Sequence, residues 1–181
     1  ITMRLFTAID IPDELREKLR GLTAELMPTA PLAWSAEANW HITTKFVGEF
    51  SDGPAMEAAL ATVRVPAFDV EIRGLGWYPN PHQPRVFFAG VAAPEELGDL
   101  HDQTDAACGR LGIPRETKRY SPHLTLARIK TPVPLVELRQ VIGDLPTIEF
   151  GKFHVGSFWL YASRMGTEGS VYRKLKEFPL G

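Results

Sequence analysis

The sequence carries one four-residue pattern twice: a histidine, an apolar residue, a threonine and one further residue. The copies are His41-Ile42-Thr43-Thr44 and His123-Leu124-Thr125-Leu126, one in each half of the chain. Each lies in an apolar run typical of a β-strand, in which residues i and i+2 point to the same side. Each copy therefore sets an imidazole beside a hydroxyl. If the two strands meet, two histidines and two hydroxyls suit acid–base chemistry on an anion such as a phosphodiester.

Either copy alone is a weak signal, because histidine and threonine also occur on the exposed faces of ordinary strands. Both copies have an apolar residue after the histidine, and both continue as apolar-rich strands at corresponding places in the two halves. The pair therefore favours a functional site over two unrelated strand faces.

Composition and charge limit the class of protein. With 181 residues, 44% of them hydrophobic and 23% charged, residues 1–181 are expected to form a single globular domain with a sizeable core. No apolar run reaches the roughly 20 residues of a membrane span and no secretory leader is visible. No membrane partner is expected, and the protein is expected to be cytoplasmic and monomeric. A net charge of −2 disfavours a grip on long nucleic acid and leaves RNA ends or small nucleotides as partners.

Other catalytic classes have little support. The single cysteine, Cys108, excludes an intrachain disulfide and a cysteine-based zinc site, and its helical context predicts a small buried side chain. The motif histidines are accompanied by hydroxyls rather than by a third histidine or a carboxylate, so no metal and no other cofactor is expected. A Gly-x-Ser-x-Gly elbow of serine hydrolases is also missing from the sequence.

Hydrophobic periodicity and turn residues divide the chain into strands and helices. A strand-helix-strand-helix-strand order is expected in the first half and nearly again in the second, giving approximate, interleaved halves 3–76 and 85–181. The Pro-rich stretch 77–85 is expected to be an irregular loop between them. The motif strands are expected at 40–47, ended by Gly48, and at 123–129. Further strands are expected at 4–9, 68–75, 86–91, 148–161 (one or two strands) and 171–178, and helices at 13–26, 54–63, 94–111 and 136–142.

Four segments, in order, resemble the two-histidine (2H) phosphoesterase superfamily, and within it the RNA 2′,3′-cyclic phosphodiesterases, also called 2′-5′ RNA ligase-like proteins. The resemblance extends over nearly the whole chain. The segments are residues 4–9, 41–49, 121–128, and 157–161 followed by 169–172.

The resemblance implies an α/β (α+β) fold of duplicated β-α-β-α-β units. In this fold two antiparallel sheets form a central groove with pseudo-twofold symmetry, and the helices lie outside. It also implies metal-independent hydrolysis of a 2′,3′-cyclic phosphate to a 2′-phosphate, on RNA ends such as tRNA fragments or on cyclic nucleotides, with weak reversible 2′-5′ RNA ligation. It makes His41 the proton donor to the leaving 3′ oxygen and His123 the base that activates water. The near symmetry of the two motifs leaves that order open from sequence alone.

Thr43 and Thr125 are expected to donate hydrogen bonds to the non-bridging phosphate oxygens. Arg128 is expected to bind the substrate phosphate. Strict alternation places Arg128 opposite His123, but a bulge near the strand end can redirect it; a surface ion pair is the alternative. Lys45 is expected on the same face as the first histidine, as a supporting charge or as a solvated strand end.

Several aromatic and histidine side chains are ambiguous. Aromatic residues near the motifs are candidates for stacking on a base, although strand aromatics are more often core; these are Phe6, Trp34, Trp40 and Tyr120. The remaining histidines are expected to have surface or structural roles; these are His82, His101 and His154.

Two alternatives remain open from the sequence. One is a hydrolase of another small cyclic or 2′-5′ phosphodiester, such as ADP-ribose 1″,2″-cyclic phosphate or 2′-5′ oligoadenylate. The other is a non-catalytic RNA- or nucleotide-binding module, which the presence of both motif histidines disfavours.

Overall fold

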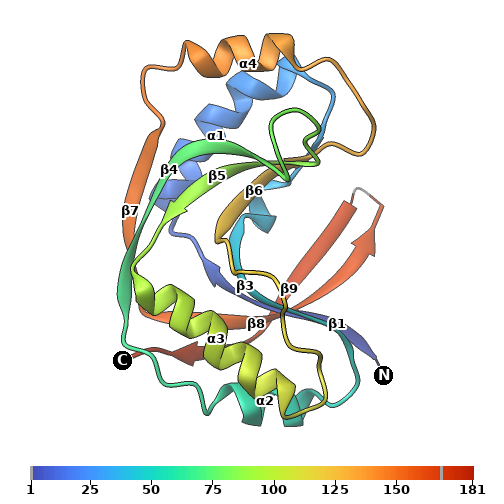
Figure 1. Ribbon diagram of the computed structural model, residues 1–181, viewed down its shortest axis with the longest axis vertical. Helices are drawn as coiled ribbons and strands as arrows, with labels where there is room; N and C mark the ends of the chain where they lie inside the picture. Colours follow the sequence, from blue (N-terminus) through green and yellow to red (C-terminus); the bar gives the residue numbers. More distant parts are fainter. Residues whose placement is uncertain (1, 168) are drawn as a thin grey trace.

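The computed structural model describes residues 2–167 and 169–181, which form two antiparallel sheets with helices outside them (Figure 1). The α+β class is therefore confirmed. Single turns of 3-10 helix occupy Met27–Thr29 and Glu37–Asn39. The larger elements are β1 (Met3–Asp10), α1 (Asp13–Leu26), β2 (Ala33–Trp34), β3 (His41–Phe50), α2 (Gly53–Leu60), β4 (Phe68–Tyr78), β5 (Val86–Ala92), α3 (Glu95–Gly109), β6 (His123–Arg128), α4 (Val136–Gly143), β7 (Glu149–Val155), β8 (Ser157–Gly166) and β9 (Gly169–Pro179).

The two motif strands belong to different sheets. The first sheet has the strand order β3-β1-β8-β9 and the second has the order β2-β6-β5-β4-β7. Each sheet combines strands from early and late parts of the chain. In both sheets the motif strand pairs antiparallel with an earlier strand, and one α-helix lies between the two in the chain. These pairs are β3 with β1, and β6 with β5. This repetition agrees with the expected duplication.

Helices α1 and α3 each pack against the sheet that does not contain the motif strand following them in the chain. Helix α3 packs against β3 of the first sheet, whereas α1 packs against β7 of the second sheet and against α4. Figure 1 shows α1 and α4 at one end of the molecule and α2 and α3 at the other. Within the described residues no helix is long and apolar enough to cross a membrane.

The main core is built from the apolar faces that the sequence pattern predicted. The buried leucines of α1 are Leu15, Leu19, Leu22 and Leu26. Each fully buried leucine contributes about 1.5–3 kcal/mol relative to an exposed one. Cys108 is completely buried, as expected, with its thiol 3.9 Å from the sulfur of Met56.

Each motif strand contains a β-bulge at the fourth residue of its motif. In β3 the register shifts so that Thr43 pairs with Ala8 but Lys45 pairs with Thr7, which leaves Thr44 as the extra residue. In β6 the same shift makes Leu126 the extra residue. A bulge reverses the alternation of side chains beyond it. Both strands accordingly show the same burial pattern over six residues: half-buried, buried, half-buried, buried, buried, exposed.

Several expected boundaries are wrong, and two of them have identifiable reasons. Gly48 does not end the motif strand, because β3 continues to Phe50 through a second register shift. Gly48 lies at φ +85°, a conformation that glycine adopts without strain, so the strand bends there instead of stopping. The expected loop at 77–85 begins two residues late, because Trp77 and Tyr78 still pair with β5.

The bulge also overturns the expected position of Lys45. Lys45 lies on the core side of β3, 4% exposed, and not on the face of His41. Its ammonium donates to Asp105 Oδ1 at 2.8 Å and to the Pro114 carbonyl at 3.3 Å. Asp105 also accepts a hydrogen bond from Arg115 at 2.8 Å. Lys45 therefore joins the motif strand to helix α3 rather than to a substrate.

Replacing Asp105 by alanine is expected to lower the free energy of unfolding by about 3–5 kcal/mol, because it leaves the Lys45 ammonium buried without its carboxylate. Urea denaturation at pH 7 measures this loss. Asp69→Ala is the matched control: Asp69 pairs with His154 at the surface, and its removal should cost less than about 1 kcal/mol. A cost for Asp105→Ala as small as that of the control would contradict a buried ion pair.

The same ion pair predicts a pH dependence of stability. Burial alone would raise the pKa of the Asp105 carboxyl, but hydrogen bonds from Arg115, Lys45 and the Glu116 amide outweigh burial and lower it to about 2. Because an unfolded aspartate has a pKa of about 3.9, this stabilisation is present above about pH 4 and is lost as the pH falls toward 2. The free energies of unfolding of wild type and Asp105→Ala should therefore approach each other as the pH falls from about 4 to 2.

Candidate active site

Each motif histidine is oriented by a backbone carbonyl two residues before it. His41 Nδ1 lies 2.6 Å from the Asn39 carbonyl, and His123 Nδ1 lies 2.9 Å from the Ser121 carbonyl. Since a carbonyl oxygen can only accept, Nδ1 carries the proton in both rings. When a ring is neutral, its unprotonated Nε2 therefore lies on the side away from this anchor. Both motifs expose the same nitrogen for chemistry.

The threonine of the first motif completes this geometry. Thr43 Oγ1 lies 2.8 Å from His41 Nε2, and with Nδ1 protonated the hydroxyl donates to Nε2. Thr43 and His41 therefore lie on one face of β3, as the sequence predicts. His123 and Thr125 occupy the corresponding half-buried positions of β6.

The segment before His41 is held by α1. The Arg16 guanidinium donates to the Glu37 carbonyl at 2.5 Å and to the Trp40 carbonyl at 3.4 Å. It also bonds Asp10 Oδ1 at 2.6 Å, and Asp10 pairs directly with His41 across β1 and β3. Sequence reasoning missed Arg16, because nothing in the helical pattern distinguishes it from a solvated arginine.

Aromatic rings enclose His41. Its ring centroid lies 5.0 Å from that of Phe6, 5.3 Å from that of Tyr172 and 6.1 Å from that of Tyr161. The ring centroid of His123, by contrast, lies 5.3 Å from that of Phe88. The two histidines thus repeat one backbone geometry in different surroundings.

Enclosure changes the protonation of His41. Burial lowers the pKa of the ring from 6.5 to about 4. The hydrogen bond with Asn39 and the charge of Asp10 oppose this shift. The charges of Arg128 and His123 add to it, which places these two residues of β6 near His41. Strands β3 and β6 also contact each other directly, so the structure brings the two motifs together. With a pKa of about 4, His41 is neutral at pH 7 in the ligand-free protein.

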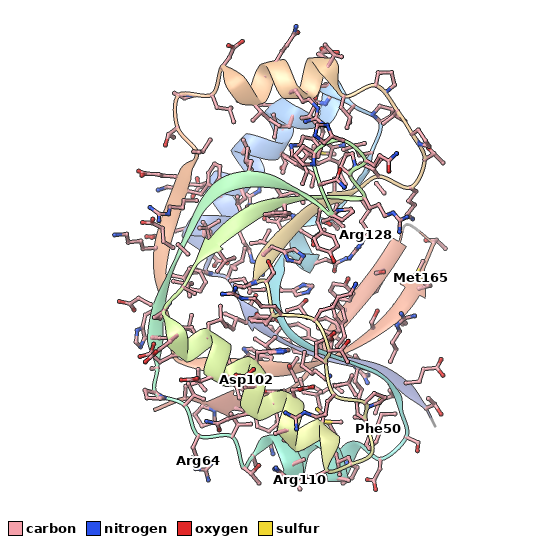
Figure 2. The ribbon with its side chains drawn as sticks, in the orientation of Figure 1. Phe50, Arg64, Asp102, Arg110, Arg128 and Met165 are labelled. Atoms are coloured by element: carbon pink, nitrogen blue, oxygen red, sulfur yellow. The ribbon has the colours of Figure 1, made fainter. Side chains whose placement is uncertain are left out.

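The bulge in β6 returns Arg128 to the side of His123 and Thr125. Ala127 takes the buried position and Arg128 the exposed one, the reverse of strict alternation. Arg128 pairs with Val86, two residues from Phe88, the ring that lies against His123. Figure 2 shows Arg128 near the end of β6, between the end of the molecule with α1 and α4 and the end with α2 and α3. The arginine is thus positioned at the motif face.

The corresponding position in the first motif is Phe46, which is 65% exposed. Sequence reasoning missed it, because strict alternation puts Lys45 and not Phe46 beside Thr43. The ring of Phe46 lies 6.3 Å from that of Phe6. It therefore offers an accessible aromatic surface next to the His41 cluster.

Of the four aromatic candidates, two are buried and two are half-buried with their polar atoms hydrogen-bonded. Phe6 and Trp40 are 4% and 3% exposed, so neither presents a free ring face. Trp34 donates to the Ala30 carbonyl and packs edge-on against Phe87. Tyr120 donates its hydroxyl hydrogen to the Thr43 carbonyl at 2.7 Å.

The remaining histidines have surface or structural positions, as predicted. His82 is exposed in the 79–85 loop, and His154 pairs with Asp69 at the surface. His101 is buried in α3 with Nδ1 2.6 Å from the Thr44 carbonyl. Across residues 2–167 and 169–181, histidine, cysteine, aspartate and glutamate side chains form no group of three that could hold a metal ion.

Comparison with known proteins identifies related chains. Residues 6–166 match the family described as the 2′-5′ RNA ligase superfamily. A protein of Archaeoglobus fulgidus named RNA 2′,3′-cyclic phosphodiesterase is 32% identical over 97% of this chain and 99% of its own. A protein of the same name from Aeropyrum pernix is 35% identical over 81% of this chain and 85% of its own.

Solved structures show the same fold. A crystal structure described as a phosphoesterase is 28% identical and superposes with a TM-score of 0.83, covering 99% of both chains. The structure of E. coli LigT complexed with 3′-AMP is 26% identical, with a TM-score of 0.80 over 99% of both chains.

The enclosure of His41 is directly measurable. We expect the His41 imidazole to titrate at about pH 4 in the ligand-free protein, because its half-buried ring is surrounded by aromatic side chains that reduce its contact with water. Two-dimensional NMR of the imidazole nitrogens follows this titration, and a His41→Gln variant assigns the resonance. A midpoint near 6.5, the value of a solvated histidine, would show that water reaches the ring freely.

Proposed function

Because the chain belongs to the 2′-5′ RNA ligase superfamily, we propose that it is a metal-independent RNA 2′,3′-cyclic phosphodiesterase. In this proposal it opens a 2′,3′-cyclic phosphate at an RNA end, or on a nucleotide, and leaves a 2′-phosphate. The names of the Archaeoglobus and Aeropyrum relatives support the activity. The observation that carries it is the repeated geometry of the motifs, in which each histidine is anchored through Nδ1, which leaves Nε2 for chemistry, and the two motif strands are in contact.

The proposed reaction needs two proton transfers and stabilisation of the phosphoryl oxygens. His123 Nε2 takes a proton from water as the water oxygen bonds to phosphorus. His41 Nε2–H gives a proton to the 3′ oxygen as the bond between phosphorus and that oxygen breaks. Each transfer contributes roughly 10²–10⁴-fold to the rate. Proton count and charge balance, and each histidine ends in the other's starting state.

The Thr43 and Thr125 hydroxyls are proposed to donate to the non-bridging oxygens, a preorganised electrostatic contribution. In the ligand-free protein the Thr43 hydroxyl bonds His41 Nε2. Rotation of this hydroxyl toward a bound phosphate would free Nε2 for the leaving oxygen. Thr43 would thus change partner once a substrate binds.

Substrate binding is proposed to protonate His41. Its pKa of about 4 keeps the free ring neutral at pH 7. A phosphodiester carries a negative charge, and an opposite charge within about 4–6 Å favours the protonated form of a histidine. His41 can therefore serve as the donor when the phosphate is bound. The same site run in reverse exchanges the two roles, which accommodates weak 2′-5′ ligation.

The surroundings of the two motifs suggest where the substrate lies. Arg128, an exposed cation, is proposed to bind the phosphate, and the accessible ring of Phe46 is proposed to stack on a base. These two residues occupy equivalent places after the bulges. The phosphate would therefore be held mainly from the second motif and the nucleoside mainly from the first.

The test is turnover by EDTA-treated protein of an oligoribonucleotide ending in a 2′,3′-cyclic phosphate. The expected product is a 2′-phosphate. His41→Ala and His123→Ala are each expected to lose at least about 10²-fold in kcat/KM, because each removes one proton transfer.

His154→Ala is the matched control and should keep full activity, since His154 is exposed on β7 and paired with Asp69. Failure of the wild type to turn over both this oligonucleotide and 2′,3′-cyclic mononucleotides would contradict the proposed substrate. Activity would then have to be sought on another small phosphodiester, or the protein treated as a binding module.

Arg128→Ala is expected to lower kcat/KM about 10–100-fold, because charge-assisted hydrogen bonds to phosphate are worth about 1.5–3 kcal/mol. Arg128→Lys should recover part of this loss, since a lysine keeps the charge without the planar fork of the guanidinium. Steady-state kinetics at fixed ionic strength measures both. Arg73→Ala, a change at an exposed ion pair on β4, is the control. Equal activity of Arg128→Ala and the control would exclude a phosphate contact.

A further inference from the structure

The first motif lies on an edge strand of its sheet. Strand β3 is the outer strand of its sheet, with β1 on one side. The bulge at Thr44 disrupts the regular ladder between these strands, so backbone groups there need other partners. The edge that carries the first histidine therefore depends on contacts from outside its own sheet.

Tyr120 supplies one of these contacts. Its hydroxyl donates to the Thr43 carbonyl at 2.7 Å. Tyr120 lies three residues before His123, in the segment that leads into β6. This hydrogen bond therefore joins the backbone of the first motif directly to the lead-in of the second.

His101 supplies the next contact. Its Nδ1 donates to the Thr44 carbonyl at 2.6 Å, and its ring stacks on Tyr120 with centroids 4.3 Å apart and planes 5° apart. One turn further along α3, Asp105 holds the ammonium of Lys45. Residues four apart share a helix face. Helix α3 and Tyr120 together thus bind two consecutive carbonyls and the next side chain of the bulge.

The contacts of Tyr120 and His101 are linked through Thr43 to the imidazole of His41. The Thr43 carbonyl is held by Tyr120, and the hydroxyl of the same residue lies 2.8 Å from His41 Nε2. The Thr44 hydroxyl is fixed in turn by Thr7, at 2.6 Å. A shift of the bulge would move the Thr43 hydroxyl and His41 relative to the second motif.

We propose that Tyr120 and His101 are positioning residues that set the placement of His41 and Thr43 relative to His123. The proposal rests on the proposed cyclic phosphodiesterase function. Neither residue touches the substrate in this assignment. They act by binding the Thr43 and Thr44 carbonyls. Because Tyr120 lies close to His123 in the chain, its hydrogen bond fixes the distance between the two motifs.

The decisive variant is Tyr120→Phe, which removes the hydroxyl and keeps the ring stacked on His101. We expect kcat to fall about 10–100-fold, because small misplacements of reacting groups cost about this much. KM should change by less than about threefold and the melting temperature should stay close to that of wild type, since direct substrate contacts and the core are retained. Tyr78→Phe, at a 46% exposed tyrosine on β4, is the matched control and should leave kcat unchanged.

A second pair of variants separates the hydrogen bond from packing. His101→Asn keeps an N–H donor near the position of Nδ1, whereas His101→Leu removes it. We expect His101→Asn to retain clearly more activity than His101→Leu at equal folded fraction. Equal kcat for these two variants, or an unchanged kcat for Tyr120→Phe, would overturn the positioning role.

A readout without turnover keeps the two proposals distinguishable. NMR titration of His41 in Tyr120→Phe should show a pKa above the value of about 4 expected for wild type, because a loosened bulge admits water to the ring. Wild type that fails to open any 2′,3′-cyclic phosphate would refute the proposed function alone. An unchanged His41 titration in Tyr120→Phe would refute the positioning role, whatever the substrate.

Discussion

The β-bulge after each motif threonine determines which side chains reach the site. It turns one extra residue of each strand toward the core, so that two neighbouring side chains are buried and the next is exposed. In β3 this places Lys45 in the interior and Phe46 at the motif face. In β6 it places Ala127 in the interior and Arg128 at the motif face. Without the bulges, Lys45 would lie at the motif face and Arg128 would point into the core.

The bulge also explains why helix α3 belongs to the site. A bulge leaves backbone groups and a redirected side chain that the sheet itself does not bind. Helix α3 provides these partners: His101 donates to the Thr44 carbonyl, and Asp105 accepts from the Lys45 ammonium. Structural and catalytic requirements are thus met by the same few contacts, and a buried ion pair stabilises the strand that carries His41.

The sequence predicted the helices, most of the strands and the shared face of each histidine and threonine, because these follow from local periodicity. It misplaced Lys45 and overlooked Phe46, since a bulge depends on pairing with a neighbouring strand and leaves no periodic signal. It assigned His101 only a structural or surface role and could not identify its partner, a carbonyl 57 positions away in sequence. The enclosure of His41 by Phe6, Tyr161 and Tyr172 likewise arises from three different strands.

In the proposed reaction both motifs act on one phosphate. A crystal structure with a bound 2′-phosphorylated nucleotide is the decisive test. We expect one phosphate group with His41 Nε2 and His123 Nε2 both within hydrogen-bonding distance, and with the Thr43 and Thr125 hydroxyls on its oxygens. A phosphate bound by a single motif, or bound away from both, would contradict the two-histidine site.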